Sequence, residues 1–114
     1  MKDLLKQFDG NPDFVKTVRE IVRRIAKVAR PEKIILFGSS IRGNGGSAGD
    51  IDLLVVKRIV KRRQLAGRIY KALIGVGRAV DIIVATPEDI ERYKDSPSLV
   101  IYPALQEGKV IYAA

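Results

Sequence analysis

Cysteine and histidine are both absent from this chain of 114 residues. Without cysteine there is no disulfide framework and no thiolate chemistry. Without histidine, a Ser-His-Asp triad, an HExxH zinc site and a histidine general base are all excluded. Proton transfer at any active site is therefore left to other groups.

Long apolar runs are also absent. No run approaches the roughly 20 residues that a membrane-spanning helix needs, and Met1 to Leu4 lacks the apolar stretch of a signal peptide. We therefore expect a cytoplasmic protein that does not contact the membrane. The length predicts a single domain over residues 1–114.

Acidic residues are missing from the whole stretch between Asp52 and Asp81, whereas eight basic residues lie between Lys57 and Arg78. The full chain has 21 basic and 13 acidic residues, a net charge of +8. Such a balance favours nucleic acid, an acidic protein or the phosphates of a nucleotide as partner. The basic stretch can equally be a solvated helix face. Its one aromatic residue, Tyr70, gives little support for stacking on single-stranded bases.

Apolar periodicity and turn residues predict eight elements. Asn11-Pro12 is typical of a helix start, and Thr86-Pro87 is typical of another. Helices are expected over 12–30, 59–74, from 86 onwards, and over 98–105; strands are expected over 33–37, 51–56, 79–85 and 109–112. The order α-β-β-α-β-α-α-β indicates an α/β fold with a small sheet covered by helices.

Two carboxylates, Asp50 and Asp52, stand at the head of an apolar strand and point to the same face, roughly 6.5–7 Å apart along the strand. A third, Asp81, is the only acid in the next predicted strand. If the two strands pair, three carboxylates can converge and hold two divalent metals for phosphoryl or nucleotidyl transfer. Alternatively, these acids pair with basic residues or cap turns.

The glycine-rich stretch from Gly38 to Gly49 matches neither of two well-known phosphate motifs. Asn44 stands where the Walker motif requires lysine, and the dinucleotide motif requires a following helix, whereas a strand follows here. Glycine after a strand nevertheless lets backbone N–H groups approach a phosphate closely. Ser39 adds a hydroxyl, and Arg42 can pair with phosphate oxygens. A plain hairpin loop is the alternative.

Taken together, Gly38-Ser39, ten intervening residues, Asp50-Ile51-Asp52 and the later Asp81 resemble the minimal nucleotidyltransferase (MNT) family of the DNA polymerase β superfamily. The motifs cover about Lys33 to Ala85, and the ending from Ser98 to Tyr112 is also similar to the family's C-terminal segment. The resemblance implies a polymerase-β-type nucleotidyltransferase fold, a small mixed β-sheet flanked by helices.

The resemblance also implies roles for individual residues. Gly38 and Ser39 would hold the β- and γ-phosphates of ATP, Asp50 and Asp52 would bind two Mg²⁺ ions, and Asp81 would bind the catalytic metal and help activate the attacking hydroxyl. The chain departs from the family's frequent pattern at Ser40 and Gly49, neither of which is a metal ligand.

Many members of this family are antitoxins encoded beside a HEPN-domain toxin, and some transfer AMP from ATP to a tyrosine of that toxin. The resemblance therefore implies an Mg-dependent nucleotidyltransferase with a HEPN-domain partner, and a homo-oligomer is compatible with it. Two alternatives stay open. One is a non-catalytic module that neutralises the partner by contact, and the other is a small basic protein that binds nucleic acid.

Overall fold

The apolar stripe of the first predicted helix forms α1 (Pro12–Ala29) in the computed structural model, which describes residues 5, 12–38, 50–58, 61–96 and 101–114. Its buried side chains recur at spacings of three and four: Phe14, Val18, Ile21, Val22, Ile25 and Ala29. Because this spacing follows the helical period, one face of α1 is apolar throughout its length. The expected cap Asn11 lies outside the described residues.

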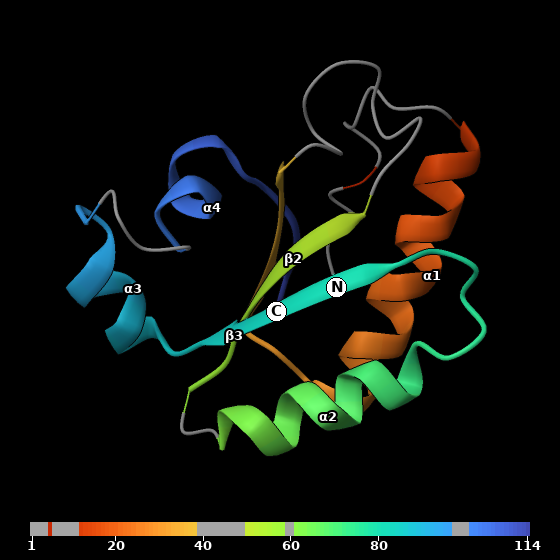
Figure 1. The fold of residues 1–114 in the computed structure, drawn as a ribbon, viewed down its shortest axis with the longest axis horizontal. Coiled ribbons are helices and arrows are strands. Elements are labelled where there is room, and N and C mark those ends of the chain that lie inside the picture. The colour runs from red at the N-terminus through yellow and green to blue at the C-terminus, as the bar shows by residue number, and fades with distance from the viewer. Residues whose placement is uncertain (1–4, 6–11, 39–49, 59–60, 97–100) are drawn as a thin grey trace.

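Four strands form one mixed sheet in the order β3-β2-β1-β4. β1 (Lys33–Phe37) pairs antiparallel with both β2 (Ile51–Val56) and β4 (Lys109–Ala113). β3 (Val80–Ala85) pairs with β2 in parallel. Parallel neighbours need a long crossover, which α2 (Arg62–Ala72) provides between them (Figure 1).

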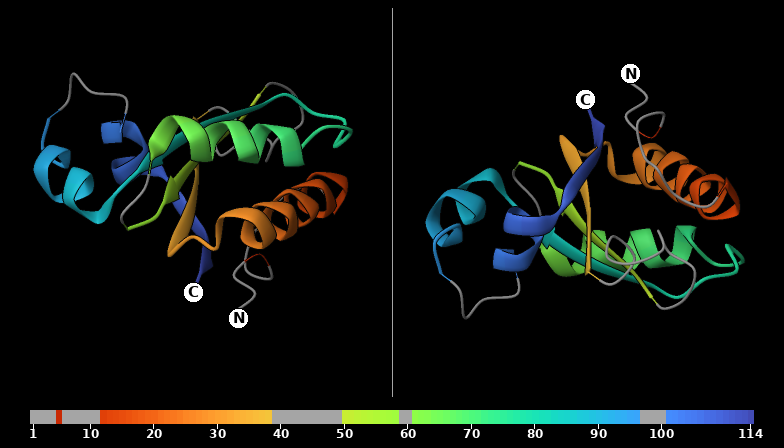
Figure 2. Two further views of the ribbon diagram at one scale, coloured as in Figure 1. Left: turned by 90° about the horizontal axis from the view of Figure 1, so that it is seen from below. Right: turned by 90° about the horizontal axis from the view of Figure 1, so that it is seen from above.

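Helices cover both faces of the sheet. Leu53 and Val55 of β2 belong to the apolar cluster under α1 and α2, whereas Leu54 and Val56 belong to a second cluster under α3 (Pro87–Tyr93) and α4 (Ile101–Glu107). Figure 2 shows α1 and α2 running side by side, with α3 and α4 at the left of both views. Strands buried on both faces read as continuous apolar runs, which explains the sequence of β2.

The predicted order of elements and the small mixed sheet flanked by helices are confirmed. Two helices differ from their predicted limits by two residues or more. Over the described residues α2 begins at Arg62 and ends at Ala72, inside the expected 59–74, because the backbone of Lys61 is extended and that of Leu73 is no longer helical. α4 extends to Glu107, two residues beyond the expected end, and its expected start at Ser98 lies outside the described residues.

α3 begins where its sequence predicts. The Thr86 hydroxyl accepts a hydrogen bond from the backbone N–H of Asp89 (3.1 Å), and the Asp89 carboxylate accepts one from the backbone N–H of Thr86 (3.0 Å). This reciprocal cap satisfies two backbone donors at the helix start. Within the described residues, no helix is both long and apolar enough to cross a membrane.

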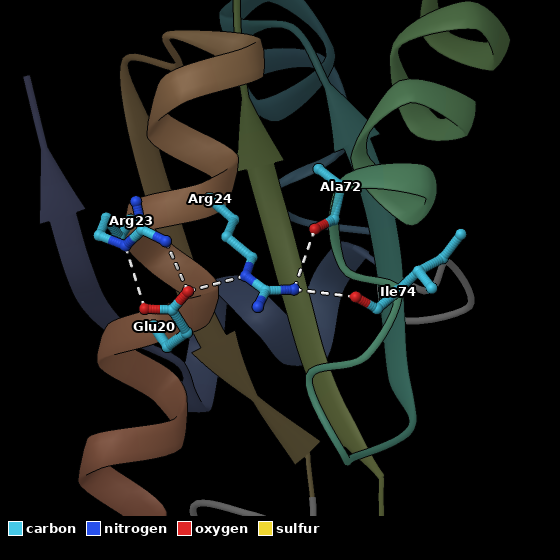
Figure 3. Close-up of polar contacts among 5 residues, drawn as sticks. All are labelled: Glu20, Arg23, Arg24, Ala72 and Ile74. Carbon is cyan, nitrogen blue, oxygen red and sulfur yellow. Dashed lines mark hydrogen bonds and ion pairs between the residues drawn. The ribbon is translucent and has the colours of Figure 1, made fainter.

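A polar network joins α1 to the end of α2 (Figure 3). Glu20 accepts hydrogen bonds from Arg23 (2.7 and 3.0 Å) and Arg24 (2.8 Å). Arg24 in turn donates to the backbone carbonyls of Ala72 (3.2 Å) and Ile74 (3.0 Å). Glu20 therefore orients the arginine that satisfies the carbonyls at the end of α2. Hydrogen bonds from Arg23 and then from Arg24 lower the pKa of Glu20 to about 2.

Replacing Glu20 with Gln should lower the stability of the protein in a pH-dependent way. The lowered pKa means that the charged Glu20 stabilises the folded state above its usual pKa of 4.5, and that this contribution is lost as the pH falls towards 2. Urea unfolding across this range should show a difference between wild type and variant that shrinks with acidification.

The substitutions Arg23→Gln and Arg24→Gln provide the matched comparison for this network. Arg24→Gln should lower the free energy of unfolding more than Arg23→Gln does, because it also leaves the backbone carbonyls of Ala72 and Ile74 without their donor. A difference between wild type and Glu20→Gln that stays constant with pH would contradict the role of the Glu20 charge.

Candidate active site

Asp52 and Asp81 lie directly opposite each other in the parallel pair of β2 and β3. Residues in register on neighbouring strands point to the same face of the sheet. That face is the one covered by α3 and α4, because Leu54 and Ile83, two residues further along each strand, belong to the apolar cluster there. The predicted pairing of the two strands thus brings two of the three carboxylates together.

Asp50 precedes β2 by one residue and is exposed. Its charge acts on Asp52, two residues further on. In the part of the chain that the structure describes, no group of three or more acidic, histidine or cysteine side chains is placed to hold a metal ion. The structure therefore pairs Asp52 with Asp81, and the three-carboxylate metal site stays a prediction.

The carboxyl of Asp52 is the electrostatic centre of the site. Partial burial raises its pKa most, followed by the negative charges of Asp81 and Asp50 and a side-chain hydrogen bond with Asp81. Burial and like charges both disfavour the ionised form, so this arrangement costs free energy while no cation is bound. A cation held at these carboxylates would relieve the repulsion.

Gly38 brings the backbone directly against that carboxyl. It follows β1, whose last residue Phe37 pairs with Asp52. Its φ of +81° belongs to the left-handed region, which glycine adopts without strain. A Cβ at this position would overlap Oδ2 of Asp52 and lie 3.1 Å from its Cγ. Gly38 therefore lies so close to Asp52 that an added side chain would force the Asp52 carboxyl to shift.

The donors at this end of the sheet fit a hard divalent cation. Asp50, Asp52 and Asp81 offer only carboxylate oxygens, which Mg²⁺ prefers, and the chain has no histidine or cysteine to favour a softer metal. The other two predicted nucleotide-binding residues, Ser39 and Arg42, lie outside the described residues. Their roles stay predictions.

Tyr70 has a role near this site that the sequence did not indicate. Its hydroxyl accepts a hydrogen bond of 2.8 Å from the backbone N–H of Ile82, the residue after Asp81. The contact ties α2 to β3 beside the carboxylate pair. The sequence marks Tyr70 only as the aromatic residue of the basic stretch, because a contact between distant elements has no local signal.

Much of the basic stretch makes structural contacts. Arg62 pairs with Asp89, Arg68 donates to the backbone carbonyl of Val28 (2.9 Å), and Lys57 donates to that of Arg30 (3.2 Å). These cations connect the loop after β2 and helix α2 to α1 and α3. Part of the charge excess in this stretch therefore supports the fold.

Replacing Gly38 with Ala should destabilise the protein by about 1–3 kcal/mol, because it imposes backbone strain and drives a methyl group into the Asp52 carboxyl. Gly77→Ala is the matched control: its φ is +85°, but an added Cβ would meet nothing within 4 Å. Chemical denaturation of both variants separates the two effects: the loss in Gly77→Ala measures backbone strain, and the additional loss in Gly38→Ala measures the clash with Asp52. Equal losses would show that the approach to Asp52 has no energetic consequence.

Replacing Asp52 with Asn should stabilise the metal-free protein by up to about 1 kcal/mol at neutral pH, because it removes repulsion from Asp81 and Asp50. Added Mg²⁺ should then raise the unfolding temperature of the wild type and leave that of the variant nearly unchanged. Asp95→Asn, the same change at an exposed position after α3, serves as control. An equal response of Asp52→Asn and wild type to Mg²⁺ would contradict metal binding at this carboxylate.

Comparison with known proteins agrees with this fold. The family model of the nucleotidyltransferase domain matches residues 15–110, a range that contains Gly38 and all three aspartates. No curated protein and no solved structure matches the chain significantly. The mixed sheet and the carboxylate pair on β2 and β3 are consistent with the same family. The chain thus belongs to the nucleotidyltransferase domain family, within the DNA polymerase β superfamily.

Proposed function

We propose that this nucleotidyltransferase is Mg²⁺-dependent, that it transfers AMP from ATP to a protein hydroxyl, and that the acceptor is a tyrosine of a HEPN-domain toxin which the transfer neutralises. The observation that carries the proposal is the register of β2 and β3, which sets Asp52 beside Asp81 next to the Gly38 turn. The family match supports nucleotide transfer, and the resemblance to minimal nucleotidyltransferases supports the protein acceptor and the antitoxin role.

The nucleotide would lie on the Gly38 side of the site. Since Gly38 has no side chain, the backbone after β1 can approach phosphate oxygens as closely as it approaches Asp52. In this proposal Ser39 adds a hydroxyl donor to the β- and γ-phosphates, and Arg42 adds a charged one. These contacts would orient the α-phosphate of ATP towards the carboxylates.

Asp50, Asp52 and Asp81 would hold the metal, two Mg²⁺ ions in the family that the chain resembles. Bound there, Mg²⁺ would offset the negative charge that gathers on the attacking and leaving oxygens. The pairing of β2 with β3 fixes the spacing of Asp52 and Asp81, because β2 is largely buried and β3 is paired with it along its whole length.

In the transfer step, the acceptor hydroxyl oxygen bonds to the α-phosphorus of ATP. The bond from that phosphorus to the oxygen bridging to the β-phosphate breaks, and pyrophosphate leaves. The hydroxyl proton passes to Asp81 or to water, since the chain has no histidine to receive it. Asp81 is exposed and stands on the edge strand β3, so an acceptor can reach it.

The acceptor would be presented by another protein. Every described helix and strand belongs to the sheet or to the helices that cover it, so none of them forms a separate acceptor-binding unit. A cytoplasmic HEPN-domain partner encoded by the neighbouring gene would meet this need, and assembly as a homo-oligomer is compatible with it. The contact-only module is the second candidate, and the experiment below separates the two.

The double substitution Asp50→Asn with Asp52→Asn should abolish transfer. We expect labelled AMP on the co-purified product of the neighbouring gene to fall at least about 100-fold, the scale at which loss of one electrostatic stabiliser lowers kcat. Intact-mass measurement with ATP and Mg²⁺ would show the modification and count the AMP groups.

The pair Glu91→Gln with Asp95→Asn, the same charge change on exposed residues near α3, should leave transfer intact. If AMP transfer survives the loss of Asp50 and Asp52, the mechanism is wrong. If the partner is neutralised equally well by the inactive variant, contact rather than catalysis is the protein's function.

A further inference from the structure

A groove of about 500 Å³ lies where the end of β3 meets α3 and α4, on the opposite side of Ile83 from Asp81. This volume is in the range of sites that bind small molecules. The helices that border the groove, α3 and α4, lie at the left in Figure 1. Its walls are Arg62, Ile83, Val84, Ala85, Asp89, Arg92, Tyr93 and Ile101.

The groove and the carboxylate pair share one strand and one face. Asp81, Ile83 and Ala85 are alternate residues of β3, so their side chains point the same way. At about 3.3 Å per residue, Ile83 and Ala85 lie roughly 7 and 13 Å along the strand from Asp81. An extended segment lying over β3 could thus reach both the carboxylate and the groove.

The chemistry of the groove is mostly apolar with one available cation. Ile83, Ala85 and Ile101 provide aliphatic surface. Arg62 is already paired with Asp89. Arg92 is exposed, lies 5.8 Å from the centre of the Tyr93 ring, and makes no ion pair with any described residue. The groove therefore offers an apolar floor and one guanidinium at its mouth.

A nucleic-acid strand fits this chemistry poorly. Glu88, Glu91 and Asp95 are exposed on or just after α3, where they would repel successive phosphates. The groove has one aromatic ring, Tyr93, for base stacking. An uncharged peptide backbone carrying an apolar side chain and a single carboxylate avoids this repulsion and can pair with Arg92.

We propose that this groove recognises the acceptor. It takes an apolar side chain from an extended peptide segment, about two or four residues from the hydroxyl that receives AMP, so that both side chains face the sheet. A carboxylate on the same side of the segment pairs with Arg92. The assignment rests on the proposed function, since the segment must present its hydroxyl to Asp81. Residues of β3, α3 and α4 would then select the acceptor, and the turn that binds the nucleotide would not.

The test uses the full chain with Mg-ATP and short tyrosine peptides of Gly-Ser background. One series carries leucine, with a glutamate two residues beyond it, at increasing distance from the tyrosine; the other lacks both residues. We expect transfer to be most efficient at separations of about two or four residues, because side chains of an extended segment alternate between its two sides. Arg92→Gln should raise KM for the preferred peptide about 10-fold or more, the loss expected for a charge-assisted hydrogen bond, with kcat nearly unchanged.

Lys94→Gln is the matched control, because it removes the same charge from the same part of the chain outside the groove. Ile83→Thr, which keeps the branch at Cβ but places a hydroxyl in the apolar floor of the groove, should also raise KM for the preferred peptide and should leave KM for the plain peptides unchanged. Equal KM values for Arg92→Gln and Lys94→Gln would overturn the assignment. So would a preference for oligonucleotide acceptors that these substitutions abolish.

The two proposals fail in different ways. If no peptide is modified while the co-purified partner protein is, the groove assignment is wrong and AMP transfer to a protein stands. If the partner protein is not modified either, the proposed function itself fails.

Discussion

The register between β2 and β3 is the constraint on which the rest of this molecule depends. Side chains alternate along a strand, so a slip of one residue would turn Asp81 into the apolar layer under α1 and α2 and expose Ile82 in its place. Burial on both faces prevents such a slip, because Leu53 and Leu54 of β2 are fully buried on opposite sides. The apolar core thus specifies the polar site: the free energy gained by packing holds two carboxylates together that would otherwise move apart.

Local signals sufficed for most of the fold. The helical spacing of α1, the Thr86-Pro87 start of α3 and the β-branched runs of β1 and β2 each encode their own structure, and all are found where expected. The limits of α2 were less predictable, because Lys61 is not a capping residue and helical periodicity continues past Ala72. The strand order is a global property. Nothing local in β4 indicates that it pairs with β1 at the side opposite β2.

Some features of the candidate site were also predictable from local sequence, and others were not. Asp50, Asp52 and Asp81 could be selected from residue type and spacing alone, because carboxylates at the head of apolar strands are costly unless they have a use. Glycine at position 38 was expected for close approach to a phosphate, and the structure adds that the turn is already in contact with Asp52. Tyr70 and the groove beside α3 could not be predicted, since they arise where residues far apart in sequence meet.

The bond between the Tyr70 hydroxyl and the backbone of Ile82 has a consequence for how this protein meets other chains. β3 is one of the two outer strands of the described sheet, and outer strands with unsatisfied amides can pair with strands of other molecules. Tyr70 occupies the amide that such a strand would use next to Asp81. The hydrogen bond thereby disfavours pairing of β3 with the same strand of another copy next to Asp81. This agrees with the proposed acceptor binding, in which a peptide lies over the face of the sheet and contacts it through side chains.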